Sequence, residues 1–359
     1  MSYREKAQAR AEALLSRGQG YVLAVESSCD ETAAAVVDLN QRVYSNVVAS
    51  SAKVFEAYGG VVPEIASRKH MELLPHVVEK ALCDAGLTLD DIDCVAGTMG
   101  PGLVGALLCG LSYAKALAFG RDLPFIGVNH MEGHIAANQL EGPMDYPHIC
   151  LTVSGGHTQL LYAQDPVTFY QMGQTVDDAA GEAFDKAARA LDLPYPGGPN
   201  LERLAREGDE NAYAFTRPKL KRPMDFSFSG IKTAVINLLH TAEQRGEKIN
   251  RADVAASFQK AVVGMLLHNA FAACREMDVH TLAICGGVAA NGYLQNRAAA
   301  EAGALGIKLY LPSRAMCTDN AAMIGAAAVN RIKNRQFMGL STNAVPGLKL
   351  QYMQDALHI

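Results

Sequence analysis

The 359-residue sequence predicts an α/β protein built from two similar lobes, and three observations lead to this fold class. Stretches 21–38 and 148–163 each consist of an apolar strand, a polar turn and a second apolar strand. Stretches 92–119 and 280–304 each consist of a short strand, a glycine-containing turn and a helix. The chain is also long for a single core. We therefore expect duplicated α/β lobes with a nucleotide cleft between them.

The order of these segments gives the expected boundaries. Residues 1–20 are charged and helix-prone, so we expect a short helical extension there. The N-terminal lobe is expected over 21–134, joined by the C-terminal segment 326–359, and the C-terminal lobe over 135–325. The longest apolar stretch, 103–114, is too short to span a bilayer and is followed by Lys115, so no membrane segment is expected.

Charge and cysteine content narrow the class of protein. A net charge of −5 and a pI near 6.1 argue against a protein that coats nucleic acid through bulk positive charge. The eight cysteines are scattered without a C-x-x-C pair, which suggests neither a zinc ribbon nor a disulfide framework. A reducing cytoplasm fits best.

One stretch is locally basic. Loop "TRPKLKRP" could contact RNA, with help from a second basic group, although such runs are usually solvated loops and no aromatic residues interleave here. The basic residues in question are Arg217, Lys219, Lys221 and Arg222, with Arg68, Lys69 and His70 as the second group.

Two histidines stand one helical turn apart in "VNHMEGHIAANQL". Asn129 can cap a helix on which His130 and His134 share one face, the spacing of a metal-binding pair. The zinc-protease motif H-E-x-x-H needs a glutamate directly after the first histidine, whereas Glu132 lies two positions on, roughly 200° around the helix. The alternative is that both histidines merely decorate an amphipathic helix.

Asp319 in "CTDNAAMIG" precedes an expected helix, so capping of that helix is its simplest role. Combined with His130 and His134, it would instead complete a site with two imidazoles, one carboxylate and open positions. Catalytic iron(II) or zinc uses such sites, whereas structural sites are closed by four ligands.

Other segments suit a nucleotide. The turn "SGGHT" offers backbone N–H groups and hydroxyls to phosphate oxygens, or is a plain hairpin turn. Asp30 and Glu31 in "SSCDET" are turn carboxylates or act on a reacting group. In "DDAAGEAFDKAARAL" the acidic residues suit a solvated helix face, yet Asp185 or Glu202 could take ribose hydroxyls. "FSFSGIKTA" lacks the P-loop core, which excludes ATP hydrolysis of that type.

Taken in order over about residues 21–335, these motifs closely resemble those of the universal tRNA adenosine threonylcarbamoyltransferase family. They are "VESSCDET", "YGGVVPEIASRKH", "GPGLVGALL", "NHMEGH", "VSGGHTQL", "DDAAGEAFDK", "YPGGP", "FSFSGIKT", "CGGVAAN" and "CTDNAAMIG". The histidine in "SGGHT" is similar to the bacterial and organellar branch. The resemblance implies the two-lobed fold of actin, Hsp70 and sugar kinases.

The resemblance also implies a reaction. A threonylcarbamoyl group would pass from threonylcarbamoyl-AMP to the exocyclic amine of the adenosine 3′ of the anticodon, in tRNAs that read codons beginning with A. His130, His134 and Asp319 would bind iron(II) or zinc, and Asp30 would accept the amine proton. The donor nucleotide, with ATP or AMP as other occupants of the cleft, would be held by Thr152, Val153, Ser154, Gly155, Gly156, Asp185, Gly198, Glu202 and Asn291.

Partners follow from the same resemblance. They are the tRNA anticodon loop, a smaller paralogous protein of the same fold and a P-loop ATPase, with the donor supplied by a separate synthase. A cytoplasmic location is expected. Two alternatives are a metal-dependent protease that uses the same histidines, and a nucleotide-binding regulator without catalysis.

Overall fold

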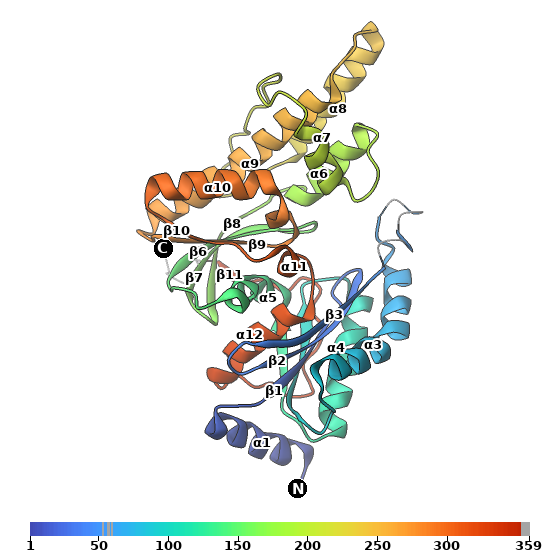
Figure 1. Ribbon diagram of the computed structural model, residues 1–359, viewed down its shortest axis with the longest axis vertical. Helices are drawn as coiled ribbons and strands as arrows, with labels where there is room; N and C mark the ends of the chain where they lie inside the picture. Colours follow the sequence, from blue (N-terminus) through green and yellow to red (C-terminus); the bar gives the residue numbers. More distant parts are fainter. Residues whose placement is uncertain (52–53, 56–57, 59, 353–359) are drawn as a thin grey trace. The chain divides into compact units, whose positions relative to one another are not determined.

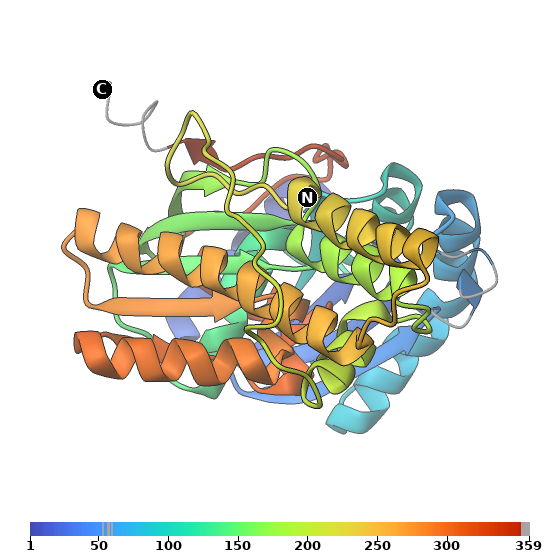
Figure 2. The same ribbon diagram turned by 90° about the horizontal axis from the view of Figure 1, so that it is seen from above.

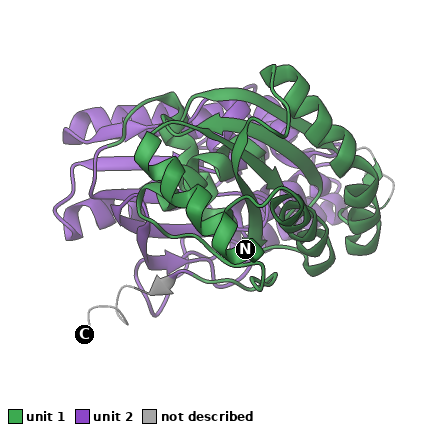
Figure 3. Ribbon diagram, turned by 90° about the horizontal axis from the view of Figure 1, so that it is seen from below, with its two compact units in different colours: residues 1–144, 318–349 green, residues 145–317, 350–359 purple. Residues whose placement is uncertain are grey.

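The computed structural model describes residues 1–51, 54–55, 58 and 60–352, and the chain folds into two compact units (Figure 3). Unit 1 comprises residues 1–144 and 318–349, and unit 2 comprises residues 145–317 and 350–359. Unit 1 is therefore assembled from both ends of the sequence, whereas nearly all of unit 2 comes from one continuous segment.

Unit 1 contains, within the described residues, a five-stranded sheet in the order β3-β2-β1-β4-β5 (Figure 1). The first three strands pair antiparallel, and β1, β4 and β5 pair parallel. The hairpin predicted over 21–38 is confirmed. The strands are β1 (Tyr21–Glu26), β2 (Glu31–Asp38), β3 (Val43–Ser50), β4 (Ile92–Gly100) and β5 (Phe125–Asn129).

Helices cover both faces of this sheet. Leu23 and Val25 of β1 pack with α3 and α4, because alternate residues of a strand point to opposite faces. α12 packs on the other face, where a Cβ at Gly325 would lie 2.7 Å from Val37. The helices of unit 1 are α1 (Tyr3–Arg17), α3 (Pro63–Ala85), α4 (Val104–Gly120), α5 (His130–Ala136) and α12 (Ala321–Lys333), followed after α5 by the 3₁₀ turn η1 (Ala137–Glu141).

The N-terminal helix and the segment that follows α12 are both tied to unit 1. Ser2 caps α1 with a reciprocal bond to Glu5, and Tyr3 donates its hydroxyl to the carbonyl of Leu123 at 2.8 Å. After α12, the N–H of Val345 bonds the carbonyl of Met99 at 2.7 Å. The segment after α12 therefore reaches the carboxyl end of β4, and through Met338 it also bonds the carbonyl of Phe125 at the start of β5.

Unit 2 contains, among the residues the structure describes, a six-stranded sheet in the order β10-β9-β6-β7-β8-β11. β6, β7 and β8 pair antiparallel, whereas β6, β9 and β10 pair parallel. The second predicted hairpin, over 148–163, is also confirmed. The strands are β6 (His148–Val153), β7 (Thr158–Asp165), β8 (Thr168–Gln174), β9 (Thr281–Cys285), β10 (Lys308–Tyr310) and β11 (Gln351–Tyr352).

The helices of unit 2 share one core with its sheet. Ile149, Leu151 and Val153 of β6 point into this core, where residues of α6 to α10 pack on them. Figure 2 shows α9 (orange) and α10 (darker orange) running along the unit. The elements are α6 (Ala180–Ala190), α7 (Gly197–Ala205), α8 (Ser229–Arg245), α9 (Arg251–Glu276), η2 (Gly287–Ala290), α10 (Gly292–Leu305) and α11 (Arg314–Cys317).

The units divide the chain at other residues than the predicted lobes. The break falls at 144/145 instead of 134/135, because α5 and η1 pack on α12. It falls at 317/318 instead of 325/326, so Asp319 and the whole of α12 belong to unit 1. The cleft predicted between the lobes stays a prediction. Among the described residues, no helix combines the length and the apolar character needed to cross a bilayer.

Candidate metal centre and ligand pocket

Two histidines of unit 1 lie on α5, directly after the buried strand β5. Asn129 begins the helix as predicted, because its Oδ1 accepts the N–H of Met131 at 2.8 Å. His130 is 4% exposed and His134 is fully buried. Their rings lie edge to face with centroids 4.7 Å apart. Burial of both rings argues against the alternative in which they merely decorate an amphipathic helix.

Asp319 joins the two histidines from the segment before α12. The cap of α12 is Asn320, whose Oδ1 accepts the N–H of Met323 at 3.1 Å, so the capping role considered for Asp319 is wrong. Asp319 Oδ1 lies 3.2 Å from Nε2 of His134 and 3.5 Å from Nε2 of His130. These three residues, each offering one ligand atom within 4.8 Å of the others, form the candidate metal centre.

The candidate metal centre fits a divalent transition metal. Neither ring nitrogen of His134 has a hydrogen-bond partner among the described residues, although Nε2 lies close to Asp319. A buried nitrogen without a partner is costly, and a cation held between the imidazoles and the carboxylate would satisfy it. The Asp319 side chain is 23% exposed, so the centre keeps a side accessible to a substrate.

Opposite charges hold the centre together in the metal-free chain. Burial lowers the pKa of His130, but the carboxylates of Asp319 and Glu26 outweigh it and hold the pKa well above the usual value. Burial likewise raises the pKa of Asp319, but His130 and His134 outweigh it and hold the pKa well below its usual range. A metal must displace the proton on His130, so its affinity should fall as the pH falls.

Glu132, the third residue of α5, is not available as a catalytic base. Arg331 of α12 donates from Nε and Nη2 to both carboxylate oxygens at 2.8–2.9 Å. Both side chains are largely buried, with exposed fractions of 13% for Arg331 and 9% for Glu132. This bidentate pair engages the only glutamate on α5, which argues against the protease alternative.

Two further carboxyl groups lie at the turn between β1 and β2. Burial and the negative charge of Asp319 raise the pKa of Asp30. Burial raises the pKa of Glu31 to about 7, and its Oε1 accepts the hydroxyl of Ser50 at 2.9 Å. Both groups thus lie in the field of Asp319 and are shifted toward the pKa range of general bases.

Unit 2 contains a pocket of about 330 Å³. Five of the nine residues predicted to hold a nucleotide line it, although they come from four separate segments. These five are Gly155, Asp185, Gly198, Glu202 and Asn291. The pocket is of the size that small ligands and cofactors occupy.

The other four predicted residues do not line this pocket. Thr152 and Val153 are buried in β6, where both pair with neighbouring strands, and the hydroxyl of Thr152 lies 3.3 Å from Cys285 Sγ. Ser154 and Gly156 lie in the following turn, which the N–H of Ser154 closes by bonding the carbonyl of His157 at 2.8 Å. Thr152 is paired with β7 and β9, so the sheet uses its backbone groups, whereas Val153 is paired with β7 at the end of the strand.

Carboxylates of the pocket hold the beginnings of two helices. Asp185 Oδ1 accepts the N–H groups of Gly197 and Gly198, at 2.9 and 3.2 Å, at the start of α7. Glu202 Oε1 accepts the N–H of Gly292 at 3.2 Å, at the start of α10. These helix ends, which usually attract phosphate, are already occupied by negative charge. The surroundings of these carboxylates therefore suit hydroxyl groups better than anions.

Several pocket residues escaped sequence reasoning, among them Gly181, Phe184, Gly287 and Arg314. A Cβ on Gly181 would lie 2.7 Å from the carbonyl of Ser154, so glycine is what allows α6 to approach the turn. The signal for Gly181 was its small-residue segment, which we interpreted only as an acidic helix face. Arg314 begins the short helix α11, whose sequence has no pattern that indicates a ligand.

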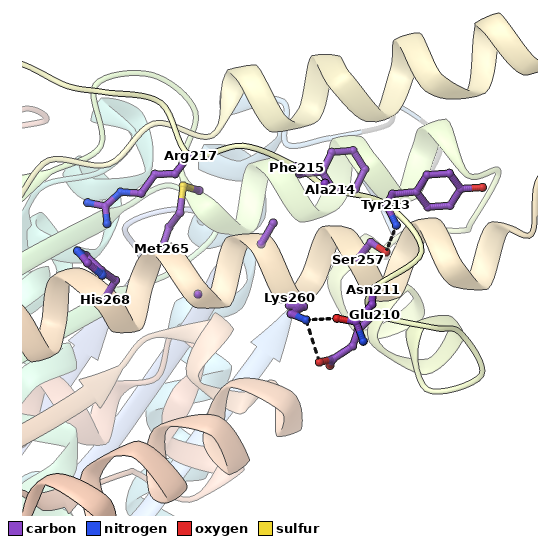
Figure 4. Close-up of a pocket in the computed structure, with 12 residues that line it drawn as sticks. Glu210, Asn211, Tyr213, Ala214, Phe215, Arg217, Ser257, Lys260, Met265 and His268 are labelled. Atoms are coloured by element: carbon purple, nitrogen blue, oxygen red, sulfur yellow. Dashed lines mark hydrogen bonds and ion pairs between the residues drawn. The ribbon is translucent and has the colours of Figure 1, made fainter.

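A second cavity of unit 2, of about 420 Å³, lies between α9 and residues 210–217 (Figure 4). Lys260 contacts Glu210 at 3.3 Å, and Arg217 donates to Asn269 Oδ1 at 2.6 Å. The charged side chains of Glu210, Lys260 and Arg217 in this cavity are therefore already bonded to other groups of the chain. Arg217 is the one residue of the predicted basic loop that lines this cavity.

The second predicted basic group does not form a patch. His70 is 1% exposed, and its Nδ1 lies 2.8 Å from the hydroxyl of Thr32, so its assignment to an RNA surface is wrong. Arg68 and Lys69 are exposed on α3 and form ion pairs with glutamates one turn away. The sequence alone did not indicate that His70 lies on the buried side of α3.

The fold and its two sites define an α/β enzyme with a candidate metal centre in one unit and a pocket of cofactor size in the other. Sequence comparison then gives the family. Residues 42–326 match the family described as TsaD, tRNA N6-adenosine threonylcarbamoyltransferase. The chain belongs to this family, as predicted.

Relatives that carry this name support the assignment of the chain to the family. The enzyme of this name from Clostridium botulinum (strain 657 / Type Ba4) is 54% identical over 332 residues, which cover 92% of this chain and 97% of the relative. That of Clostridium perfringens (strain SM101 / Type A) is 52% identical over 331 residues, covering 92% and 98%. The predicted activity, transfer of a threonylcarbamoyl group to N6 of adenosine in tRNA, is confirmed.

Solved structures of distant sequence support the fold alone. Full-length HypF, in a phosphate- and nucleotide-bound form, matches with a TM-score of 0.58 at 17% identity, and the match covers 88% of this chain and 55% of that one. Component A of the (R)-2-hydroxyglutaryl-CoA dehydratase of Acidaminococcus fermentans matches with a TM-score of 0.50 at 13% identity, covering 88% and 99%. The predicted fold class, that of actin, Hsp70 and sugar kinases, is confirmed.

Proposed function

We propose that the donor of this transferase is threonylcarbamoyl-AMP, and that the acceptor is the exocyclic amine of the adenosine 3′ of the anticodon in tRNAs reading codons that begin with A. The observation that carries this proposal is the candidate metal centre, whose buried imidazoles meet a carboxylate that is still accessible. Such a centre suits a reaction in which an acyl phosphate must be polarised.

The metal is proposed to be iron(II) or zinc, because two imidazoles and a carboxylate suit both ions. Bound there, it would polarise the acyl carbonyl and neutralise charge on the phosphate that leaves. His130, His134 and Asp319 would hold it, and the packing of α5 on α12 fixes the ligand positions. The same packing keeps Glu132 on Arg331, away from the reaction.

Asp30 is proposed as the group that accepts the amine proton. The amine nitrogen attacks the carbamoyl carbon, the bond from that carbon to the phosphate oxygen breaks, and AMP leaves with the electron pair. The proton released from the amine passes to the carboxylate of Asp30. Burial and the charge of Asp319 raise the pKa of this carboxyl group, which improves it as a base. Glu31, one residue on, is a second candidate for the same step.

The pocket of unit 2 is proposed to hold the nucleoside part of the donor. Asp185 and Glu202 already accept backbone N–H groups, and each carboxylate has further lone pairs for ribose hydroxyls. Gly198 and Asn291 complete the walls, and Gly155 brings the turn after β6 to the pocket. The position of that turn would be set by its neighbours Thr152, Val153, Ser154 and Gly156, which would contribute to nucleotide binding indirectly. ATP or AMP would fit the same pocket.

Further partners are proposed from the family. They are a smaller paralogous protein of the same fold, a P-loop ATPase, and a separate synthase that makes the donor. The absence of a P-loop in "FSFSGIKTA" supports this division of work. We also propose that the protein acts in the cytoplasm, where its eight free thiols would stay reduced.

The experiment is a reconstituted reaction with this protein, iron(II) or zinc, threonylcarbamoyl-AMP and an unmodified tRNA that reads such codons. Nucleoside mass spectrometry measures the product, with and without the two partner proteins. We expect product with the unaltered chain and its loss in His130→Ala and Asp319→Ala. No product even with both partners would contradict the proposed donor.

A control separates the other classes of function. Glu132→Gln should keep transferase activity, because Glu132 only pairs with Arg331. Peptide cleavage that depends on Glu132 would support the protease alternative instead. Full activity in His130→Ala would contradict a catalytic role for the metal and favour a nucleotide-binding function.

A further inference from the structure

A glutamate is fully buried at the end of β1, behind the candidate metal centre. Glu26 is 0% exposed, although it closes the otherwise apolar strand "YVLAVE". Its Oε1 accepts the N–H of Ser28 at 2.5 Å, and its Oε2 accepts the hydroxyl of Thr98 from the neighbouring strand β4. A buried carboxylate is retained only where its oxygens are satisfied, so this one is held in a fixed position.

The remaining contact of Glu26 is with a metal ligand. Its Oε2 lies 3.2 Å from Nδ1 of His130, and Ser28 Oγ lies at the same distance from that nitrogen. The other nitrogen of the ring, Nε2, points to Asp319. With a cation held beside Asp319, the lone pair of Nε2 is needed as a ligand, so the proton of the neutral imidazole belongs on Nδ1, where the carboxylate of Glu26 accepts it.

The second histidine ligand lacks such support. Neither nitrogen of His134 has a hydrogen-bond partner among the described residues, so nothing on its Nδ1 side selects a tautomer or fixes the ring by a hydrogen bond. Its ring contacts Asp319 on the Nε2 side and the ring of His130. The two ligands are therefore unequal, and only His130 has a carboxylate behind it.

We propose that Glu26 is a positioning residue of the candidate metal centre, which fixes the orientation and the tautomer of His130 through a hydrogen bond to Nδ1. Thr98 and Ser28 hold Glu26 in place for this role. A carboxylate on the far nitrogen of a histidine ligand orients the ring and strengthens its bond to the metal. The inference rests on the metal assignment of the proposed function. It adds that the metal centre also depends on a residue of β1, the strand separated by β4 from β5, which leads to His130.

The first test is metal affinity. Full-length chain stripped of metal is titrated with Zn²⁺ against a chromophoric chelator. Glu26→Gln keeps the size of the side chain and loses its charge, and we expect about 10- to 100-fold weaker binding. Thr98→Val removes only one support of Glu26, and we expect a smaller loss, about fivefold. Circular dichroism checks that each variant is folded.

The matched control is Glu132→Gln. It also removes the charge of a buried carboxylate next to the histidines, but that carboxylate bonds Arg331 and not a ligand. Its zinc affinity should stay within about twofold of the unaltered chain. Equal weakening in Glu26→Gln and Glu132→Gln would overturn the proposal, because both effects would then come from general damage to α5.

A second readout is nitrogen-15 NMR of the histidine side chains in the zinc-loaded chain, which reports which ring nitrogen carries the proton. We expect the proton of His130 on Nδ1, facing Glu26, and a mixture of the two arrangements in Glu26→Gln. A proton on Nε2 of His130 in the unaltered chain overturns the proposal.

The outcomes also separate this inference from the proposed function. Tight zinc binding by both the unaltered chain and Glu26→Gln would overturn the role of Glu26 and leave the metal centre intact. Failure of the unaltered chain to bind zinc or iron(II) would overturn both.

Discussion

The two units build their sites from different materials. In unit 1, charged side chains are buried and held by other side chains: His130 by Glu26, and α5 as a whole by the Glu132–Arg331 pair. In unit 2, glycines allow backbone segments to pack closely, and the carboxylate of Asp185 accepts a backbone N–H group at the start of α7. The difference teaches that a reacting centre needs side chains fixed by their surroundings, whereas a nucleoside pocket needs close backbone approach and acceptors for hydroxyl groups.

The largest effect should come from replacing one carboxylate in each unit by its amide. Asp319→Asn removes the negative ligand of the candidate metal centre, and we expect at least about a 100-fold loss of transferase activity. Asp185→Asn keeps one oxygen for the N–H groups of α7, so we expect at most about a tenfold loss, mainly as a higher KM for the donor. Steady-state kinetics measures both. Equal losses of activity in Asp319→Asn and Asp185→Asn would contradict the proposed difference between the two sites.

Two neighbouring glycines test the use of backbone in unit 2. A Cβ at Gly197 would lie 2.7 Å from the Asp185 backbone, so Gly197→Ala should lower the free energy of unfolding by up to about 3 kcal/mol. Gly198 has open space at the same position, and Gly198→Ala should change stability by less than about 0.5 kcal/mol. Urea unfolding measures both, and nucleotide titration follows Gly198→Ala, whose methyl group enters the pocket. Equal stability of the two variants would contradict this account.

Acid should weaken unit 2 through His148. Burial lowers the pKa of this histidine to about 4, and its Nδ1 lies 2.9 Å from the Asp145 carbonyl. Between pH 4 and 6.5 the unfolded chain binds more protons at this site, so its contribution is complete above pH 6.5 and is lost as the pH falls toward 4. We expect about 2 kcal/mol of lost stability between pH 7 and pH 5.

His148→Phe, which has no proton to bind, is the control for this pH dependence. Its difference in unfolding free energy between pH 7 and pH 5 should be smaller than that of the unaltered chain by the same amount, measured with urea. An unchanged difference would show that other groups cause the acid sensitivity.

The smallest effect concerns tRNA binding. Lys219 and Lys221 in unit 2 are exposed and form no ion pair among the described residues, whereas Arg68 and Lys69 in unit 1 are each paired with a glutamate. Lys219→Glu/Lys221→Glu should weaken tRNA binding by about three- to tenfold and reduce its salt dependence. Arg68→Glu/Lys69→Glu should change it less. Filter binding at two salt concentrations measures both double variants. A larger loss of tRNA binding in Arg68→Glu/Lys69→Glu would instead place the RNA surface on unit 1.

Local patterns predicted much of this molecule. The two hairpins, the helix after Gly102 and the cap at Asn129 all follow from residues close in sequence, because strand alternation and helix capping are local effects. The pairing of Asp319 with His130 and His134 joins positions far apart in sequence, and the motif resemblance was needed to single it out. Asp319 and Asn320 are both good N-cap residues, and only the structure shows that Asn320 caps α12.

The differences between expectation and structure have a common cause. His70 looks basic in sequence, yet tertiary packing turns it to Thr32. Thr152 belongs to a glycine-rich motif, and the strands on both sides of it use its backbone groups. The expected lobe boundary lies ten residues before the boundary between the compact units, because the packing of η1 on α12 cannot be read from either segment. Each difference concerns which other segments a residue contacts, which local patterns do not indicate.

The division of the chain between the units has a consequence for synthesis on the ribosome. Residues 145–317 leave the ribosome as one uninterrupted stretch, so the second unit can fold while translation continues. The first unit must wait, because α12 and the segment that reaches Met99 are made afterwards. The two histidines are therefore synthesised long before their carboxylate partner, and a nascent chain has no three-ligand centre with which to capture a metal until Asp319, just before α12, has been made.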